Sequence, residues 1–405
     1  MSAFMHFERL CEFGGRLAGS ASERQAIDYA RACLSDLAHG ELASHPVTYD
    51  GWRALEASIE IDGGPLPVMP LPGSSSLPDG AAELGIVDAG RGTLADLDRH
   101  GGHLRGRAVV VTHEFMFAPD HVHRCAKLAR ALELGAALFV IANPRPGEGA
   151  VTGGVFPAMP AIGVDFETGE RLRALARLGQ PARFRLRTHI GPMQTETLDW
   201  SIAPTGRPDR DPWPEIIVSA HIDGHALAES AMDNASGVAV ALAIAARHSA
   251  APLRRHRLRV LIFSAEEFGL CGGAAYVAGL DAPQRRRIGA VFNLDCVGGS
   301  TSFGAMTSGF AMLETVARTA GSATGIDLQI HSPLLKNSDH YEFARVGIPA
   351  MRLIAGFGET EGRLRYVLTG RDRRDLVSEN ELAMARRLTE TMIDLTDAGP
   401  GPVTL

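Results

Sequence analysis

Short apolar runs alternate with helix-like segments over the second half of the chain. The runs lie at 216–220, 258–263, 290–294 and 348–353, and an alanine-rich segment at 237–248 follows the first of them. Apolar runs of this length are typical of strands that are buried on both faces of a sheet. Strands that alternate with helices predict a mostly parallel sheet with right-handed crossovers, sandwiched by helices.

The first half of the chain has a different pattern. Apolar positions at helical spacing predict a helix at 23–37, and residues 63–80 are dense in Pro, Gly and Ser. A smaller α/β pattern follows, and it ends in an alternating strand at 182–189. We therefore predict an α/β fold in three stretches: 1–50 is the N-terminal part of the main domain, 51–192 is an insert, and 193–405 is the catalytic domain. The predicted elements of the insert are strands at 108–112 and 137–141 and helices at 125–134 and 169–178.

Composition narrows the class of protein. The 405 residues are 45% hydrophobic and 21% charged, as expected of a globular chain with a substantial core. With 40 basic and 47 acidic side chains the formal charge is −7, which argues against nucleic acid or an anionic membrane as partner. Five scattered cysteines and an N-terminus interrupted by Glu8 and Glu12 favour a reducing, cytoplasmic location. The sequence leaves a homo-oligomer open.

Polar residues follow the apolar runs closely. Ligands bind beyond the carboxyl ends of the strands in an open α/β sheet, so these positions are the candidates for chemistry. The residues there, or in the loops beside them, are His221, Asp223, Asp233, Glu266, Glu267, Asp295 and His340.

Each residue also has a structural explanation on its own. Asp233 suits a helix cap, His221 a satisfied core histidine, and the pair at 266 and 267 a solvated rim. Together, however, crowded carboxylates at a buried sheet edge would repel one another and lose hydration unless a divalent cation were bound. Imidazole with carboxylates suits zinc, manganese or cobalt.

The positions also indicate roles. Asp233 lies in a loop and could bridge two ions, whereas Asp223 lies on the same strand face as His221 and could fix its tautomer. Glu266 and Glu267 point in opposite directions if the strand continues, so one could bind metal while the other serves as general base.

The blocks SAHIDG, AMDNASG, FSAEEFGLCGG, FNLDCVGG and SDHYEFARVGIPA resemble the cocatalytic zinc aminopeptidase family, which includes bacterial leucyl aminopeptidases and glutamate carboxypeptidases. The resemblance covers most of the chain and implies that the insert is a protease-associated domain. It also implies that His221, Asp233 and Asp295 hold one zinc, that Asp233 and Glu267 hold a second, and that Glu266 is the general base.

One position departs from the family pattern. The last ligand in the family comes from an H-T-x-x-D segment, and the similar stretch here begins with Leu368, which cannot bind metal. His340 is our first candidate for the missing ligand, with Asp372, Tyr366 or a single-ion site as alternatives.

We therefore predict a metal-dependent hydrolase of an amide bond, either an aminopeptidase or a hydrolase of small aminoacyl amides, with one or two zinc ions. The alternatives are a glutaminyl cyclase-like acyl transfer on the same scaffold and a catalytically inactive binding protein. Two further sets of residues are interpreted as having no part in the chemistry. His113, His121 and His123 are read as a solvated loop, and four arginines as surface charges rather than receptors for a substrate carboxylate: Arg345, Arg352, Arg363 and Arg365.

Overall fold

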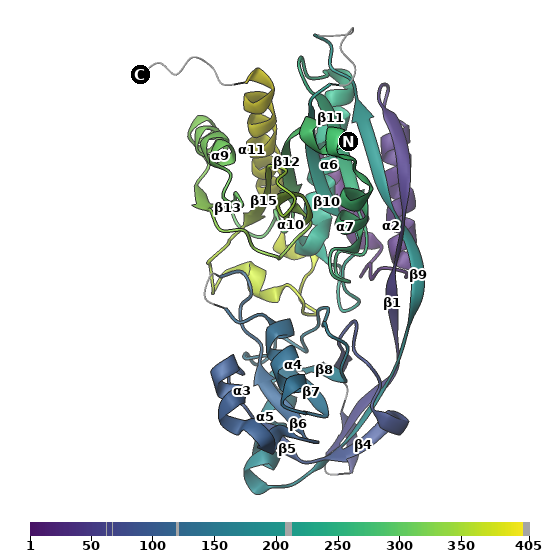
Figure 1. The fold of residues 1–405 in the computed structure, drawn as a ribbon, viewed down its shortest axis with the longest axis vertical. Helices are drawn as coiled ribbons and strands as arrows, with labels where there is room; N and C mark the ends of the chain where they lie inside the picture. Colours follow the sequence, from purple (N-terminus) through teal and green to yellow (C-terminus); the bar gives the residue numbers. More distant parts are fainter. Residues whose placement is uncertain (62, 67, 119–120, 207–212, 400–405) are drawn as a thin grey trace. The chain divides into compact units, whose positions relative to one another are not determined.

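A computed structural model describes the chain apart from residues 62, 67, 119–120, 207–212 and 400–405 (Figure 1). The described residues form two compact units. Unit 1 comprises 1–48, 194–367 and 372 onward, and unit 2 comprises 49–193 together with 368–371. The boundaries predicted at 50/51 and 192/193 lie within two residues of the main divisions, whereas the return of 368–371 to unit 2 was not anticipated. Some residues of the predicted insert (62, 67 and 119–120) and of the predicted catalytic domain (207–212 and 400–405) lie outside the described residues.

The sheet of unit 1 has the strand order β14-β13-β15-β12-β10-β11-β9. The central pairs are parallel, as predicted, whereas β13 runs antiparallel to β15 and β9 antiparallel to β11. The four predicted apolar runs are the four central strands. The strand bounds are β9 Ala182–Ile202, β10 Glu215–His221, β11 Arg257–Phe263, β12 Ile288–Leu294, β13 Phe303–Met306, β14 Leu328–His331 and β15 Ala350–Ala355.

Helices cover both faces of this sheet. The helices α1, α6 and α11 pack together on one face, and α7 and α10 contact each other over the other face (Figure 1). Ile217, Leu261 and Val291 join Val277 and Phe343 in a core on the second face, so neighbouring residues of each strand supply opposite faces. The bounds are α1 Ala3–Glu12, α2 Ala21–Ser35, α6 Ser236–Ala250, α7 Cys271–Gly279, α8 Ala282–Arg287, α9 Ala311–Thr324, α10 His340–Ala344 and α11 Glu379–Ala398.

Two of the passages of the chain between the units, at 48/49 and 193/194, lie inside long strands. Both β1 (Glu41–Ile61) and β9 are 21 residues long, and they are neighbours in the same sheet. The strand predicted at 182–189 was therefore too short. The short strands β2 (Gly64–Leu66) and β4 (Ala81–Leu84) extend this sheet within unit 2, through β1 and β9 respectively.

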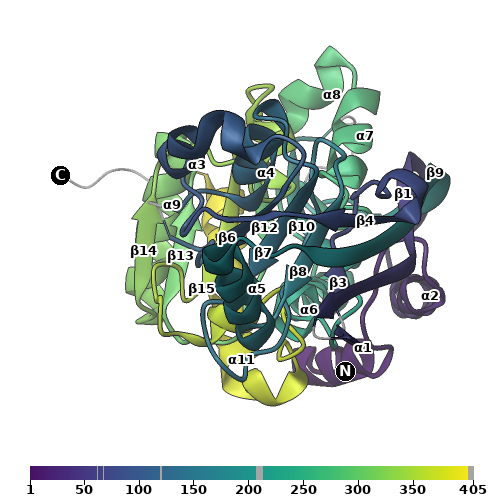
Figure 2. The same ribbon diagram turned by 90° about the horizontal axis from the view of Figure 1, so that it is seen from below.

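Unit 2 is an α/β sandwich around a second sheet, with the order β3-β8-β7-β6-β5 (Figure 2). Alternation along β6 explains its two cores, since Val110 packs in the same cluster as Leu172 of α5, whereas Val109 and Val111 pack with Leu128 of α4. The bounds are β3 Met69–Pro70, β5 Ile86–Asp88, β6 Ala108–Thr112, β7 Leu138–Ala142, β8 Ala161–Val164, α3 Leu94–His100, α4 Arg124–Glu133 and α5 Phe166–Leu178.

Among the described residues, no helix is both long enough and apolar enough to cross a membrane.

Candidate metal centre

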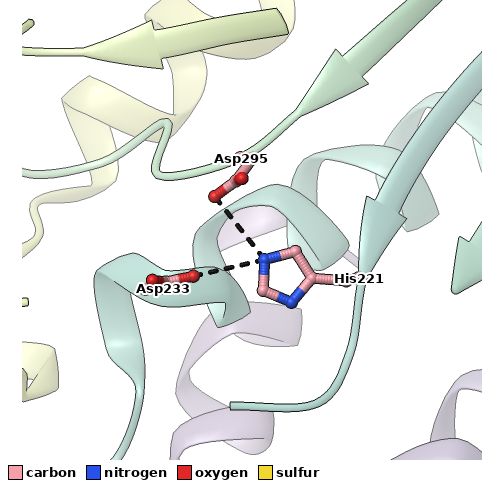
Figure 3. A group of neighbouring side chains, drawn as sticks. All are labelled: His221, Asp233 and Asp295. Carbon is pink, nitrogen blue, oxygen red and sulfur yellow. Dashed lines mark ion pairs between the residues drawn. The ribbon is translucent and has the colours of Figure 1, made fainter. Parts of the chain in front are cut away.

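Three of the predicted ligands meet at the carboxyl end of the unit 1 sheet. His221 ends β10, Asp295 directly follows β12, and Asp233 lies in the turn η3 (Ala231–Ala235) that precedes α6. Nε2 of His221 lies 3.2 Å from Oδ1 of Asp233 and 3.5 Å from Oδ1 of Asp295 (Figure 3). All three side chains are buried, and one ligand atom from each lies within 4.8 Å of the other two.

The other ring nitrogen of His221 is held by Asp223, but through the backbone. Nδ1 of His221 lies 3.0 Å from the carbonyl oxygen of Asp223 and 3.7 Å from its carboxylate. The carbonyl accepts the Nδ1 proton, so Nε2 is the ring nitrogen that faces the two carboxylates.

The carboxylate of Asp223 has a different task from the predicted one. It is fully buried and accepts one hydrogen bond from the backbone N–H of Glu266 and one from that of Glu267, each at 3.1 Å. Asp223 therefore fixes the backbone from which both glutamates project. It is a positioning residue for the predicted general base.

Hydrogen bonds from two buried side chains to the backbone hold the loop that carries Asp233 in place. The carboxylate of Asp372 accepts hydrogen bonds from the backbone N–H groups of Met232 and Asp233, at 2.8 and 3.3 Å. Arg16, which is fully buried, donates to the carbonyls of Ile222 and Ser230 at each end of the preceding loop. Asp372 thus supports a candidate ligand.

Asp295 is oriented by Arg352. Nη2 of Arg352 lies 3.1 Å from Oδ2 of Asp295, while Oδ1 of Asp295 is buried without a hydrogen-bond partner and is the oxygen turned toward His221. The interpretation of Arg352 as a surface charge was wrong, because its side chain is buried and committed to this carboxylate. Arg345 and Arg363 also pair with carboxylates, those of Glu342 and Glu381.

The electrostatics of the cluster favour positive charge. Burial opposes protonation of His221, but nearby carboxylates outweigh burial and raise the pKa of the imidazole well above its usual value; they belong to Glu266, Asp223, Asp233 and Asp295. Burial and the neighbouring Glu267 raise the pKa of Glu266 well above its usual value, although His221 opposes the shift. A cation at this point would relieve both groups.

The remaining candidate ligands lie outside the cluster of three. Among the described residues, neither Glu267 nor His340 contributes an atom within its 4.8 Å spread. His340 begins α10 and is buried, and this burial together with the charge of Arg352 lowers the pKa of its ring to about 3. Leu368 is buried in unit 2, where its carbonyl accepts a hydrogen bond from the backbone N–H of Thr152.

Three supporting residues could not be recognised from the sequence as parts of the site: Arg16, Arg352 and, as a loop anchor, Asp372. The first is 205 positions from His221 in the chain, and nothing in its local sequence separates it from arginines at the surface. For Arg352 the sequence does hold one indication of burial. It is the only charged residue of β15, and a charged residue inside a buried strand needs a partner.

Comparison with known proteins finds similarity to peptidases. Residues 204–393 match the model of peptidase family M28. Aminopeptidase YwaD of Bacillus subtilis is 25% identical over 402 residues, which cover 96% of this chain and 83% of that protein.

Solved structures share the fold over nearly the whole chain. BSAP, a zinc aminopeptidase from Bacillus subtilis, superposes with a TM-score of 0.77 at 23% identity, covering 96% of this chain and 93% of the other. A peptidase M28 precursor from Shewanella amazonensis gives a TM-score of 0.78 at 22% identity, covering 100% and 94%.

Proposed function

Because residues 204–393 match the model of peptidase family M28, we infer that His221, Asp233 and Asp295 hold the catalytic metal of a peptide hydrolase. The observation that carries this proposal is the convergence of one imidazole and two carboxylates at 3.2 and 3.5 Å from three separate segments of the chain.

The donor set fits zinc. One imidazole nitrogen and two carboxylate oxygens leave a fourth position open for water or substrate, which is the arrangement of catalytic zinc sites. The buried Oδ1 of Asp295 has no hydrogen-bond partner, and such an oxygen is costly to bury unless a cation or proton meets it. Manganese or cobalt would suit the same donors.

A zinc ion at this site would supply a Lewis acid that polarises the scissile carbonyl and acidifies the attacking water. The protein's part is then proton transfer. Glu266 takes a proton from the attacking water at its carboxylate and returns it to the leaving nitrogen. Asp223 holds the Glu266 backbone, and Asp372 holds that of Asp233, so both act by fixing geometry.

The substrate class follows from the relatives. YwaD and BSAP are both named aminopeptidases, so we assign this chain to aminopeptidases acting on small peptides or aminoacyl amides. The assignment of residues 51–192 to a protease-associated-like insert and a cytoplasmic location remain predictions from the sequence.

Replacement of Glu266 tests the function directly. Glu266→Gln should lower kcat on aminoacyl amides and peptides by about 100-fold or more, because it removes the general base, while zinc content stays that of the wild type. Glu8→Gln, at an exposed glutamate of α1, is the matched control and should be fully active. In ¹⁸O-labelled water the wild type should place label in the new carboxylate. Product without label would indicate acyl transfer, and unchanged turnover of Glu266→Gln would remove this residue from the mechanism.

Metal analysis tests the number of ions. We propose that the firmly held ion is the one at the cluster of three, so zinc-loaded protein dialysed without chelator should retain one ion per chain. Two retained ions would assign Glu267 to a second site, and substantially less than one would favour a non-catalytic binding protein.

A further inference from the structure

The helix α2 carries a buried glutamate whose contacts extend beyond its own helix. Glu23 is the third residue of α2, and its Oε2 accepts a hydrogen bond from the backbone N–H of Gly19 at 2.7 Å. In return the side chain of Ser20 accepts from the backbone N–H of Glu23. Such a pair of bonds is ordinary at the start of a helix. It uses only one of the two carboxylate oxygens of Glu23.

The other oxygen joins α2 to two strands of the unit 1 sheet. Oε1 of Glu23 accepts from the hydroxyl of Thr195 in β9, at 2.7 Å, and from the hydroxyl of Ser264, which directly follows β11. Glu23 is only 3% exposed, and Ser264 is fully buried. Burial raises the pKa of Glu23, whereas the hydrogen bonds from Ser264 and Thr195 favour its charged form. A buried carboxylate is costly to keep, and these hydroxyls and the N–H of Gly19 all donate to it, so the network suits the charged group.

Ser264 lies in the turn that carries the proposed general base. It precedes Glu266 by two residues. The residue between them, Ala265, has a φ of +57°, in the left-handed region that residues other than glycine rarely adopt. Beyond it, Asp223 holds the backbone N–H groups of residues 266 and 267. The buried carboxylates of Glu23 and Asp223 thus hold the backbone on both sides of a strained position.

The helix α7 packs closely against the same turn. The carbonyl oxygen of Ala265 accepts from the backbone N–H of Cys271 at 3.0 Å. A Cβ at Gly272 would collide with the carbonyl oxygen of Ser264, so only glycine permits this approach. A shift of Ser264 would therefore be passed on to the backbone of the turn.

We propose that Glu23 is a positioning residue for the general base, acting through the hydroxyl of Ser264. The inference rests on the proposed function, because it assigns Glu23 to the reaction only by way of Glu266. In this role Glu23 does not touch the substrate. It keeps the end of β11 where the Glu266 carboxylate reaches the attacking water. Loss of the contact should slow proton transfer, because misplacing a reacting group by about 1 Å can cost about 100-fold in rate, while substrate and zinc should bind as before.

Steady-state hydrolysis of L-leucine 4-nitroanilide, an aminoacyl amide, by the zinc-loaded full chain tests the proposal. Glu23→Gln places an N–H₂ group among partners that all donate, and Ser264→Ala removes one hydroxyl while the bond from Gly19 stays. Each variant should lower kcat about tenfold, with KM within about twofold of wild type and an unchanged zinc content. Ser264→Ala keeps the proposal testable if Glu23→Gln fails to fold.

Glu381→Gln is the matched control. Glu381 is likewise a buried glutamate at the third position of a helix with a serine N-cap, but its partners are the N–H groups of Ser378 and Gly299 and the guanidinium of Arg363. Its replacement should lower the melting temperature as Glu23→Gln does, and leave kcat within about twofold of wild type. An equal loss of kcat in this control would make the effect one of general destabilisation and would overturn the proposal.

A double-mutant cycle shows whether Glu23 acts through Glu266. In the Glu266→Gln background the base is already absent, so the addition of Glu23→Gln should lower kcat no further. A further loss of about tenfold in that background would overturn the proposal, and so would a kcat within about twofold of wild type in Glu23→Gln or Ser264→Ala. Unchanged turnover of Glu266→Gln alone would contradict the proposed function. Reduced turnover of Glu266→Gln beside normal turnover of Glu23→Gln would contradict this inference only.

Discussion

Histidines and carboxylates gather in both units, but their neighbours differ. In unit 1 the carboxylates of Asp233 and Asp295 turn oxygens toward His221, and Oδ1 of Asp295 has no hydrogen-bond partner. In unit 2 the carboxylate of Glu114, beside His113, is already paired with two cations, those of Arg91 and Lys127.

The histidines of unit 2 lie beside positive side chains and hold their protons weakly. His113, His121 and His123 line a small pocket and are half-buried, so the interpretation as a solvated loop was wrong. Burial and the positive charge of Arg124 lower the pKa values of His113 and His123 to about 3. The spacing H-x-H therefore does not make a cation site where positive side chains already occupy the carboxylate. A surplus of carboxylate oxygen distinguishes the unit 1 cluster.

Removal of one histidine from each group should give the largest contrast. His221→Ala deletes the only imidazole of the cluster of three, so tightly bound zinc should be lost and peptide hydrolysis should fall by about 1,000-fold or more. His121→Ala in unit 2 should change neither. Zinc content after dialysis and initial rates measure both effects, and equal losses in the two variants would refute the contrast.

Removal of a buried carboxylate that holds backbone N–H groups should have the next largest effect. Asp223→Asn places an amide N–H₂ against the backbone of Glu266 or Glu267, so kcat should fall by about 10- to 100-fold with little loss of zinc. Asp165→Asn is the matched change in unit 2, where Asp165 accepts from Thr168 N–H at the start of α5, and asparagine also serves as a cap. Steady-state kinetics should show normal kcat for this control.

Replacement of Lys127 tests whether the positive charges that pair with Glu114 stabilise unit 2. Its ammonium is buried, pairs with Glu114 at 2.7 Å and donates to the carbonyls of Arg91 and Thr112. Lys127→Met should lower the free energy of unfolding by about 3 kcal/mol in urea titrations, because Glu114 loses one of its two partners. Methionine keeps most of the apolar stem, so a change near zero would show that the ion pair contributes nothing to stability.

Acidification should produce the smallest effect, and His113 should supply part of it. Its pKa of about 3 in the folded protein lies below the ordinary 6.5, so the unfolded chain binds the proton more readily between these values. The free energy of unfolding should therefore fall as pH drops below about 6.5, by up to about 2 kcal/mol at pH 5 from this group. His113→Gln should remove only the share of His113 from that dependence, because the pKa of His123 is also lowered to about 3. The measurement is the difference between urea titrations at pH 7 and pH 5. The same slope in both proteins would exclude His113 as its source.

The sequence predicted those elements whose signal is local. Uninterrupted apolar runs identified β10, β11, β12 and β15, and the chemistry of a sheet edge brought His221, Asp233 and Asp295 together correctly. These succeed because burial on both faces of a strand leaves an unambiguous pattern.

Features that depend on distant partners were not predictable. The length of β1 and β9 was missed because long stretches of both strands are polar and exposed. The burial of Arg16 and of Arg352 depends on carbonyls and carboxylates that only the folded chain supplies. The contact between the His221 ring and the backbone of Asp223 could not be predicted either. Residue types do not show whether the carboxylate or the carbonyl of Asp223 accepts from the ring.

Anomalous diffraction at the zinc edge tests the central claim most directly. Crystals of zinc-loaded protein should show a peak about 2.0 to 2.2 Å from Nε2 of His221 and from a carboxylate oxygen each of Asp233 and Asp295. A peak at His121 and His123, with none beside His221, would contradict the account.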